Sequence, residues 1–239
     1  MARKTYRERL QSALLSVVDP QVGAVHNAYD ALRADRQAAQ ERRLVTLALA
    51  LTAGPASWTD AGDASPDAAR RHGVIGYASD ADLLAHLAPY VVDGLAAGDV
   101  CVVIATARHL AGLRRRLAIS GFADTEGLLV ELDADELVSS FVLDGWPDAG
   151  LFDAHVGDVV RGHVREGLGL RAFGEMVGLL VARDDVPAAL HLEKLWDAVQ
   201  LEVGFPLLCG YPAAALDRLD EETASRLLAR HTHVVSASA

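Results

Sequence analysis

The chain has 239 residues, of which 51% are hydrophobic, and a formal net charge of −11 at pH 7. This length suits one full-sized α/β domain plus an appendage. No apolar run approaches the roughly 20 residues of a membrane-spanning helix, and the basic N-terminus lacks the apolar core of a signal peptide, so we expect a cytoplasmic protein. The acidic charge is concentrated after residue 71, which argues against nucleic-acid binding by the main body.

The composition changes sharply near residue 71. Residues 1–52 combine helix formers with charged side chains and predict a helical N-terminal extension. Residues 53–71 are rich in Gly, Pro, Ala, Ser and Asp, which is typical of a linker. We therefore expect an α/β domain over 72–212, followed by a C-terminal helix and tail over 213–239.

Strand and helix patterns alternate after the linker. The predicted strands are short and mostly apolar: 72–78, 99–106, 127–133, 170–177 and 205–212. The predicted helices follow them: 79–98, 107–120, 134–145, 152–167, 185–204 and 220–231. Ser79 and Asp82 resemble a capping box, and Gly98 is a typical helix end. This alternation predicts an α/β fold with three layers and a mostly parallel sheet.

In such sheets, ligands bind at the carboxyl ends of the strands. The residues that come there are Tyr77, Thr106, Asp133, Glu175 and Tyr211. Glu175 stands out because it lies inside the apolar run "RAFGEMVGLL", and burying an unpaired charge costs several kcal/mol. Two interpretations remain open for this carboxylate. It anchors a ligand, or it caps the following helix or pairs with an arginine such as Arg171.

Several familiar sites are missing from the sequence. The phosphate-loop position reads "YASDADLLAHL", without the glycines and lysine that hold phosphates, so ATP binding in the usual way is not expected. A G-x-S-x-G nucleophile motif does not occur. We interpret Cys101 and Cys209 as inert core residues in preference to a disulfide or redox pair. His231 and His233 could bind a metal only with partners from elsewhere in the chain, and we interpret them as part of a solvated tail. No catalytic residue, metal or cofactor is therefore expected.

A set of motifs in a fixed order covers the α/β part of the chain. They read "HGVIGYASDADLLAHLAPYVVDGLAAGDVCVVIAT", "DGWPD", "RAFGEMVGLL", "HLEKLWDAV" and "PLLCGYP". Together they resemble the MEDS domain, a sensory domain named for methanogen and methylotroph signalling proteins and a dichloromethane-responsive repressor. The resemblance spans residues 72–212.

The resemblance implies a sensor related to the RecA/KaiC-type ATPase fold but without its phosphate loop. It also implies that "RAFGEM" takes the place of the ATPase strand with the metal-associated carboxylate, and that the ligand is a small organic, hydrocarbon-like compound. Members of the family often carry a DNA-binding or histidine-kinase module. The sequence shows no kinase motif after residue 212 and no helix-turn-helix in residues 1–52, so the output route stays open.

Our preferred interpretation is a non-catalytic small-molecule sensor in signal transduction or transcriptional regulation. A ligand would bind in the crevice and shift the protein between conformations. We expect a signalling partner, either a kinase or a regulator, and leave a homodimer open. The expected ligand-binding residues supply apolar walls, adaptable packing and a polar anchor: Tyr77, Asp144, Trp146, Glu175, Met176, Trp196 and Tyr211. The alternatives are a hydrolase or transferase with Glu175 as general base, or a regulatory scaffold without a ligand.

Overall fold

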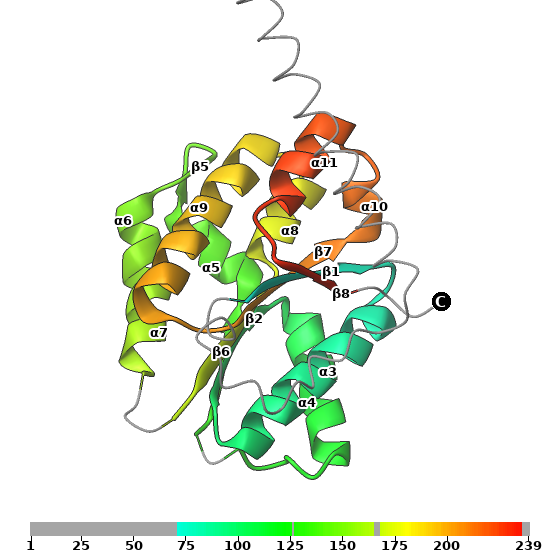
Figure 1. Ribbon diagram of the computed structural model, residues 1–239, viewed down its shortest axis with the longest axis vertical. Coiled ribbons are helices and arrows are strands. Elements are labelled where there is room, and N and C mark those ends of the chain that lie inside the picture. The colour runs from blue at the N-terminus through cyan, green and yellow to red at the C-terminus, as the bar shows by residue number, and fades with distance from the viewer. Residues whose placement is uncertain (1–70, 126, 165–167, 236–239) are drawn as a thin grey trace, which may run out of the picture. The chain divides into compact units, whose positions relative to one another are not determined.

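The computed structural model describes residues 71–125, 127–164 and 168–235 (Figure 1). The expected helical extension at 1–52 lies outside the described residues, as does the linker apart from Arg71. The structure therefore describes nearly the whole of the expected α/β domain.

A six-stranded sheet forms the centre of the domain, and all of its neighbouring strands are parallel. Across the sheet the strands follow the order β3 (Leu129–Asp133), β2 (Val100–Ala105), β6 (Leu170–Gly174), β7 (Leu207–Pro212), β1 (His72–Tyr77) and β8 (His233–Val235). Parallel neighbours need long crossover connections, which here contain helices. The predicted α/β class with a parallel sheet is confirmed.

Helices cover both faces of this sheet (Figure 1). One face carries α3 (Asp80–Ala97) and α4 (Ala107–Ile119). The opposite face carries α5 (Ala134–Phe141), α8 (Met176–Ala182), α9 (Val186–Val203) and α11 (Glu221–Leu228). Successive strand residues point to opposite faces, so Ala172 packs with α8 and α9 whereas Phe173 packs with α3 and α4. The three layers are therefore helix, sheet and helix.

The helix α3 begins and ends as the sequence predicts. The Ser79 hydroxyl accepts a hydrogen bond from the Asp82 backbone N–H, and the Asp82 carboxylate accepts one from Ala78 N–H. Gly98 ends the helix with φ of 80°, a left-handed conformation that glycine adopts without a steric penalty. At the phosphate-loop position, Ala78 and Ser79 therefore form the cap of α3, and Asp80 and Asp82 lie in the first turn of that helix.

The strand expected at 170–177 and the helix expected at 152–167 differ from the sequence prediction. The strand expected at 170–177 ends at Gly174, because Glu175 already has helical backbone angles and α8 follows. The single helix expected at 152–167 is three short pieces: α6 (Ala149–Phe152), the π-helical turn η2 (Asp153–Gly157) and α7 (Asp158–Gly162). Apolar spacing cannot separate these cases, since a helix and a helix with a π-turn bury similar faces.

A small hairpin replaces the end of the helix expected at 134–145. Strands β4 (Val142–Leu143) and β5 (Trp146–Pro147) pair in antiparallel fashion around a two-residue turn. Asp144 and Gly145 both have positive φ, of 49° and 78°, as the favoured two-residue hairpin turn requires. The Asp144-Gly145 pair, at the end of the helix predicted from the sequence, is thus the turn of a hairpin.

The C-terminal segment corrects a further expectation. Instead of a solvated tail, residues 233–235 form the edge strand β8 beside β1, and the His231 side chain is fully buried. Thr232 anchors the segment, because its N–H donates to the carbonyl of His72 at 2.6 Å and its hydroxyl to the same oxygen at 3.1 Å. A helix α10 (Ala213–Leu216) also lies between β7 and α11.

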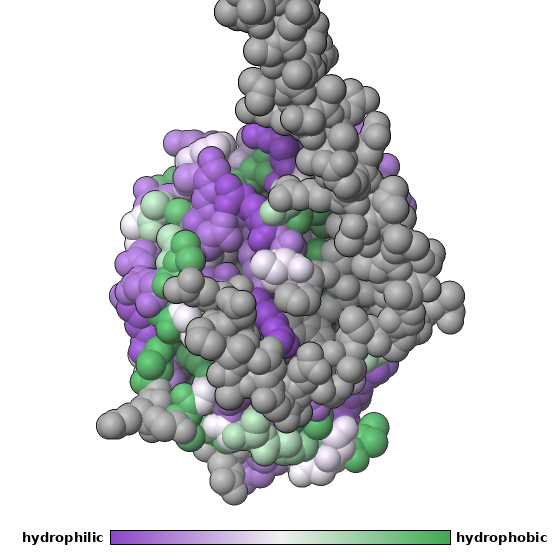
Figure 2. All heavy atoms as spheres, in the orientation of Figure 1, coloured by the Kyte–Doolittle hydropathy of each residue, from purple (hydrophilic) through white to green (hydrophobic). Residues whose placement is uncertain are grey.

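Hydrophilic side chains lie over α9 on the face of the domain drawn in Figure 2. None of the helices described in residues 71–235 combines the length and apolar character needed to cross a bilayer. The apolar residues of these helices are used mainly in the two layers of core beside the sheet.

Candidate functional site

The topology of the sheet singles out the carboxyl ends of β2 and β6. The chain leaves β2 toward β3 on one side, whereas it leaves β6 toward β7 on the other side. In open α/β sheets this change of direction opens the crevice where ligands bind. Glu175 lies there, since it directly follows β6 and its N–H donates to the carbonyl of Ile104 in β2 at 2.9 Å.

The Glu175 carboxylate is buried, with 1% of the residue exposed, and it is fully hydrogen-bonded. One oxygen accepts from the Tyr77 hydroxyl at 3.0 Å. The other accepts from the Thr106 backbone N–H at 3.0 Å and lies 2.8 Å from Nδ1 of His109. The three partners come from the ends of β1 and β2 and from the first turn of α4. Buried carboxylates need such partners, because an unpaired charge would cost several kcal/mol.

His109 links this carboxylate to the surface. Its Nδ1 faces Glu175, while its Nε2 lies 3.1 Å from a carboxylate oxygen of Asp80. Asp80 is half-exposed and pairs with the more exposed Arg108 at 3.2 Å. We name this group the Glu175 centre: Tyr77, Asp80, Thr106, His109 and Glu175. Two contacts, Glu175 to His109 and His109 to Asp80, connect the buried carboxylate to the half-exposed one.

The charges of the Glu175 centre shift the titration of its members. Burial lowers the pKa of His109, but hydrogen bonds and the negative charges of Glu175 and Asp80 outweigh burial, so its pKa is raised above 6.5. Burial, followed by the charge of Glu175, raises the pKa of the Tyr77 hydroxyl. Tyr77 therefore stays a donor at neutral pH, and the imidazole between two carboxylates favours its charged form.

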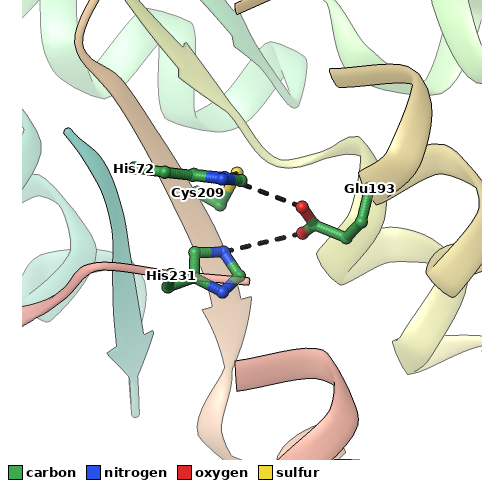
Figure 3. A group of neighbouring side chains, drawn as sticks. All are labelled: His72, Glu193, Cys209 and His231. Carbon is green, nitrogen blue, oxygen red and sulfur yellow. Dashed lines mark hydrogen bonds and ion pairs between the residues drawn. The ribbon is translucent and has the colours of Figure 1, made fainter. Parts of the chain in front are cut away.

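A second polar group lies deep in the opposite layer, between the sheet and α9 (Figure 3). We name it the buried quartet: His72, Glu193, Cys209 and His231. Its potential ligand atoms all lie within 4.8 Å of one another. Nε2 of His72 is 3.3 Å from the Cys209 sulfur and 3.6 Å from one Glu193 oxygen, and Nε2 of His231 is 3.6 Å from the other.

The fold explains why the buried quartet converges. Cys209 of β7 pairs in register with Val74 of β1, so Cys209 and His72 project from adjacent strands toward the same face. Glu193 points back at them from α9, and His231 arrives just before β8 (Figure 3). All four side chains are at most 3% exposed.

Burial is the largest influence on the pKa of three members of the quartet. It raises the pKa of the Glu193 carboxyl and of the Cys209 thiol, and it lowers the pKa of His231. The negative charge of Glu193 raises the Cys209 pKa further. Burial thus favours the neutral forms of Glu193, Cys209 and His231, as expected for polar side chains that water does not reach.

The comparison with known families gives one match. Residues 71–232 match the family described as MEthanogen/methylotroph, DcmR Sensory domain, abbreviated MEDS, over more than half of the chain. The chain belongs to the MEDS family. No curated protein matches the sequence. The matched segment contains both the Glu175 centre and the buried quartet, including His231, which lies beyond the expected domain end at residue 212.

The seven residues expected to bind a ligand in this MEDS domain lie in different places. Tyr77 and Glu175 hydrogen-bond each other in the Glu175 centre. Met176 and Trp196 are fully buried in the core layer of α8 and α9. Tyr211 is buried as well, and its hydroxyl donates to Glu193 of the buried quartet.

Asp144 and Trp146 lie in the β4–β5 hairpin. Trp146 is half-exposed and stacks on His191 of α9, with ring centroids 4.8 Å apart. Asp144 is exposed and has a positive φ, so its place in the turn already explains it. Glu175 is the N-cap residue of α8, but its side chain makes no cap hydrogen bond, and Arg171 pairs with Asp99 instead of Glu175. The ion-pair partner of Glu175 is His109.

Sequence reasoning missed His109 and the buried quartet. His109 follows the strand-end residue Thr106 by three positions, so its place in the first turn of the next helix was a usable signal. The buried quartet offers no comparable spacing, because its members come from β1, α9, β7 and the segment before β8. Only the strand register and the position of β8 bring them together.

Proposed function

We propose that this MEDS domain is a non-catalytic sensor that binds a small organic, hydrocarbon-like molecule at the Glu175 centre. The single observation that carries the proposal is the position of a buried carboxylate at the switch point of the sheet. The sensory character follows from family membership. The ligand and its site are the proposal.

The ligand would enter from the side of Asp80 and Arg108, because these two side chains are the exposed part of the Glu175 centre. A ligand that carries a hydrogen-bond donor would compete with Tyr77 or His109 for the Glu175 oxygens, while its apolar body replaces water. Since His109 and Thr106 belong to the start of α4, their displacement would move that helix end. A ligand shifts the ensemble only by its difference in affinity for the two arrangements.

One alternative is an enzyme that uses Glu175 as a general base, assisted by His109. The chain of ionisable groups from Glu175 to Asp80 favours this alternative, because it could carry a proton to water. A general base must reach the substrate proton within about 3 Å. Both Glu175 oxygens are already engaged and the side chain is buried; we prefer the binding role because the family is a sensory one.

The test is native mass spectrometry of the full chain, purified from expressing cells and screened against small halogenated alkanes and short-chain alcohols. Wild type is expected to show an adduct that Glu175→Gln weakens by about 1–3 kcal/mol, the loss of a charge-assisted hydrogen bond. The matched control is Glu131→Gln, since Glu131 pairs with Arg114 at the far edge strand. Equal adducts in wild type and Glu175→Gln would reject the Glu175 centre as the binding site.

A further inference from the structure

The buried quartet has a donor set that suits a transition metal and takes no part in the proposed sensing. Two imidazoles, a thiol and a carboxylate are the ligands that zinc uses in proteins, whereas calcium and magnesium prefer oxygen alone. Such groups rarely meet in a protein interior by chance, because each one loses its hydration there.

The spacing of the donor atoms fits a tetrahedral ion. Bonds of about 2.0–2.3 Å from zinc to nitrogen, oxygen and sulfur place neighbouring ligand atoms about 3.3–3.7 Å apart. Nε2 of His72 lies 3.3 Å from the Cys209 sulfur and 3.6 Å from Oε2 of Glu193, and Nε2 of His231 lies 3.6 Å from the other carboxylate oxygen, Oε1. The remaining pairs lie within 4.8 Å, so small side-chain rotations complete the tetrahedron.

The groups behind the ligands orient them as in metal sites. A ligating histidine usually turns its other ring nitrogen to a carboxylate or a backbone carbonyl. Here Nδ1 of His231 contacts the carbonyl of Leu227 at 3.2 Å, and Nδ1 of His72 lies 3.4 Å from a carboxylate oxygen of Asp197, at ion-pair distance but without hydrogen-bond geometry. Tyr211 donates to one oxygen of Glu193. Both imidazoles therefore present Nε2 to the same point.

Two of the polar atoms aimed at this point lack hydrogen bonds of their own. Within the described residues, Oε2 of Glu193 and Nε2 of His231 have no hydrogen-bond partner, although both are fully buried. An ordinary buried network would satisfy such atoms, since leaving them unpaired costs about 1–3 kcal/mol each. A cation at the centre would serve all four ligands at once.

We propose that His72, Glu193, Cys209 and His231 bind one zinc-class divalent ion in a closed, four-ligand site. Because four protein groups fill the tetrahedron and none is exposed, the site is structural and leaves no open position for substrate. The ion would join β1, β7 and α9 to the segment that leads into β8. The C-terminal end of the domain would thereby be fixed to the sheet.

Cobalt(II) in place of zinc gives the direct test, because a thiolate bound to four-coordinate cobalt produces a near-ultraviolet charge-transfer band and strong visible absorption. The full chain without an affinity tag is stripped with a chelator and titrated with cobalt chloride. We expect both absorptions to saturate at one cobalt per chain, and zinc to abolish them. Metal content by plasma mass spectrometry gives the stoichiometry independently.

Two cysteine variants sharpen the test. Cys209→Ser should remove the charge-transfer band, whereas Cys101→Ser should leave it unchanged, since Cys101 is equally buried but lies in the other core layer near the carbonyl of Val91. Circular dichroism establishes that each variant is folded. If Cys209→Ser does not fold, His231→Gln takes its place, with a changed visible spectrum and at least tenfold weaker cobalt binding expected. Absence of the band in folded wild type, or its persistence in folded Cys209→Ser, would overturn the proposal.

Discussion

The Glu175 centre and the buried quartet both place a carboxylate beside histidine in the interior of one domain, but they differ in their connection to solvent. The Glu175 centre continues through His109 to a half-exposed aspartate. The buried quartet is closed, with all four of its side chains almost inaccessible to water. A buried charge with a route to the surface can respond to a ligand or to pH, whereas a closed group acts on stability. The responsive group and the closed group thus lie on opposite faces of the sheet.

The largest expected effect comes from breaking the closed group. Glu193→Ala should lower the free energy of unfolding by about 3–5 kcal/mol, because it leaves two buried imidazoles and the Tyr211 hydroxyl without their common partner. Urea unfolding followed by circular dichroism measures this loss. Lys194→Ala is the control, since Lys194 is the exposed neighbour on α9 and should change the value by less than about 0.5 kcal/mol. A loss as small as that of the control would remove the energetic distinction between the two regions.

The sequence predicted one of these two regions and not the other. The sheet, its helices and the place of Glu175 follow from alternating apolar runs, because each strand end is a local property of the chain. Tyr77 and Glu175 meet as a consequence, since parallel strands bring their carboxyl ends to one edge. The hydrogen-bonding of Glu175 to His109 was not predicted, because it depends on how the first turn of α4 sits above the strand ends.

The buried quartet was beyond sequence reasoning for a physical reason. His72 and His231 are 159 positions apart and meet only because β8 adds to the edge of β1. The short segment 233–235 has no alternation that marks it as a strand, so the tail interpretation of His231 followed from local pattern alone. Cys209 was predicted to be buried and inert; its burial is confirmed, but the pattern could not show which polar groups surround it.

A moderate effect should distinguish the open region by its pH dependence. His109 has a raised pKa in the folded protein, facing Glu175, Asp80 and the Tyr77 ring, with Arg108 beyond Asp80. A group with a raised folded pKa stabilises the fold fully below its unfolded pKa, near 6.5, and loses this contribution as pH rises through the folded value. The free energy of unfolding should therefore fall with increasing pH above about 6.5.

The variant His109→Gln should flatten this part of the pH profile, because it keeps a hydrogen bond to Glu175 but cannot titrate. The measurement is a series of urea unfolding curves from pH 5.5 to pH 9 on wild type and variant. The difference in the free energy of unfolding between the two proteins is determined at each pH. His163→Gln serves as the control, since the His163 ring is partly buried and its Nδ1 lies 2.7 Å from the carbonyl of Val159 in α7. A difference that does not vary with pH would contradict the charged state of His109.

The smallest effect on stability, and the closest test of the comparison, is Asp80→Asn. Asp80 is the outer carboxylate of the Glu175 centre, with half of its side chain exposed, so its pairs with His109 and Arg108 are screened by water. Removing its charge should change the free energy of unfolding at pH 5.5 by no more than about 1 kcal/mol. It should nevertheless lower the folded pKa of His109, because one of the two negative charges that raise that pKa is lost.

The observable is the pH at which the His109 ring resonances shift in NMR. This midpoint should move down in Asp80→Asn and stay in place in Asp82→Asn, whose carboxylate caps α3 instead. Equal midpoints in wild type and Asp80→Asn would mean that Glu175 alone sets the charge of His109, and the Glu175 centre would then be as closed to the surface as the buried quartet.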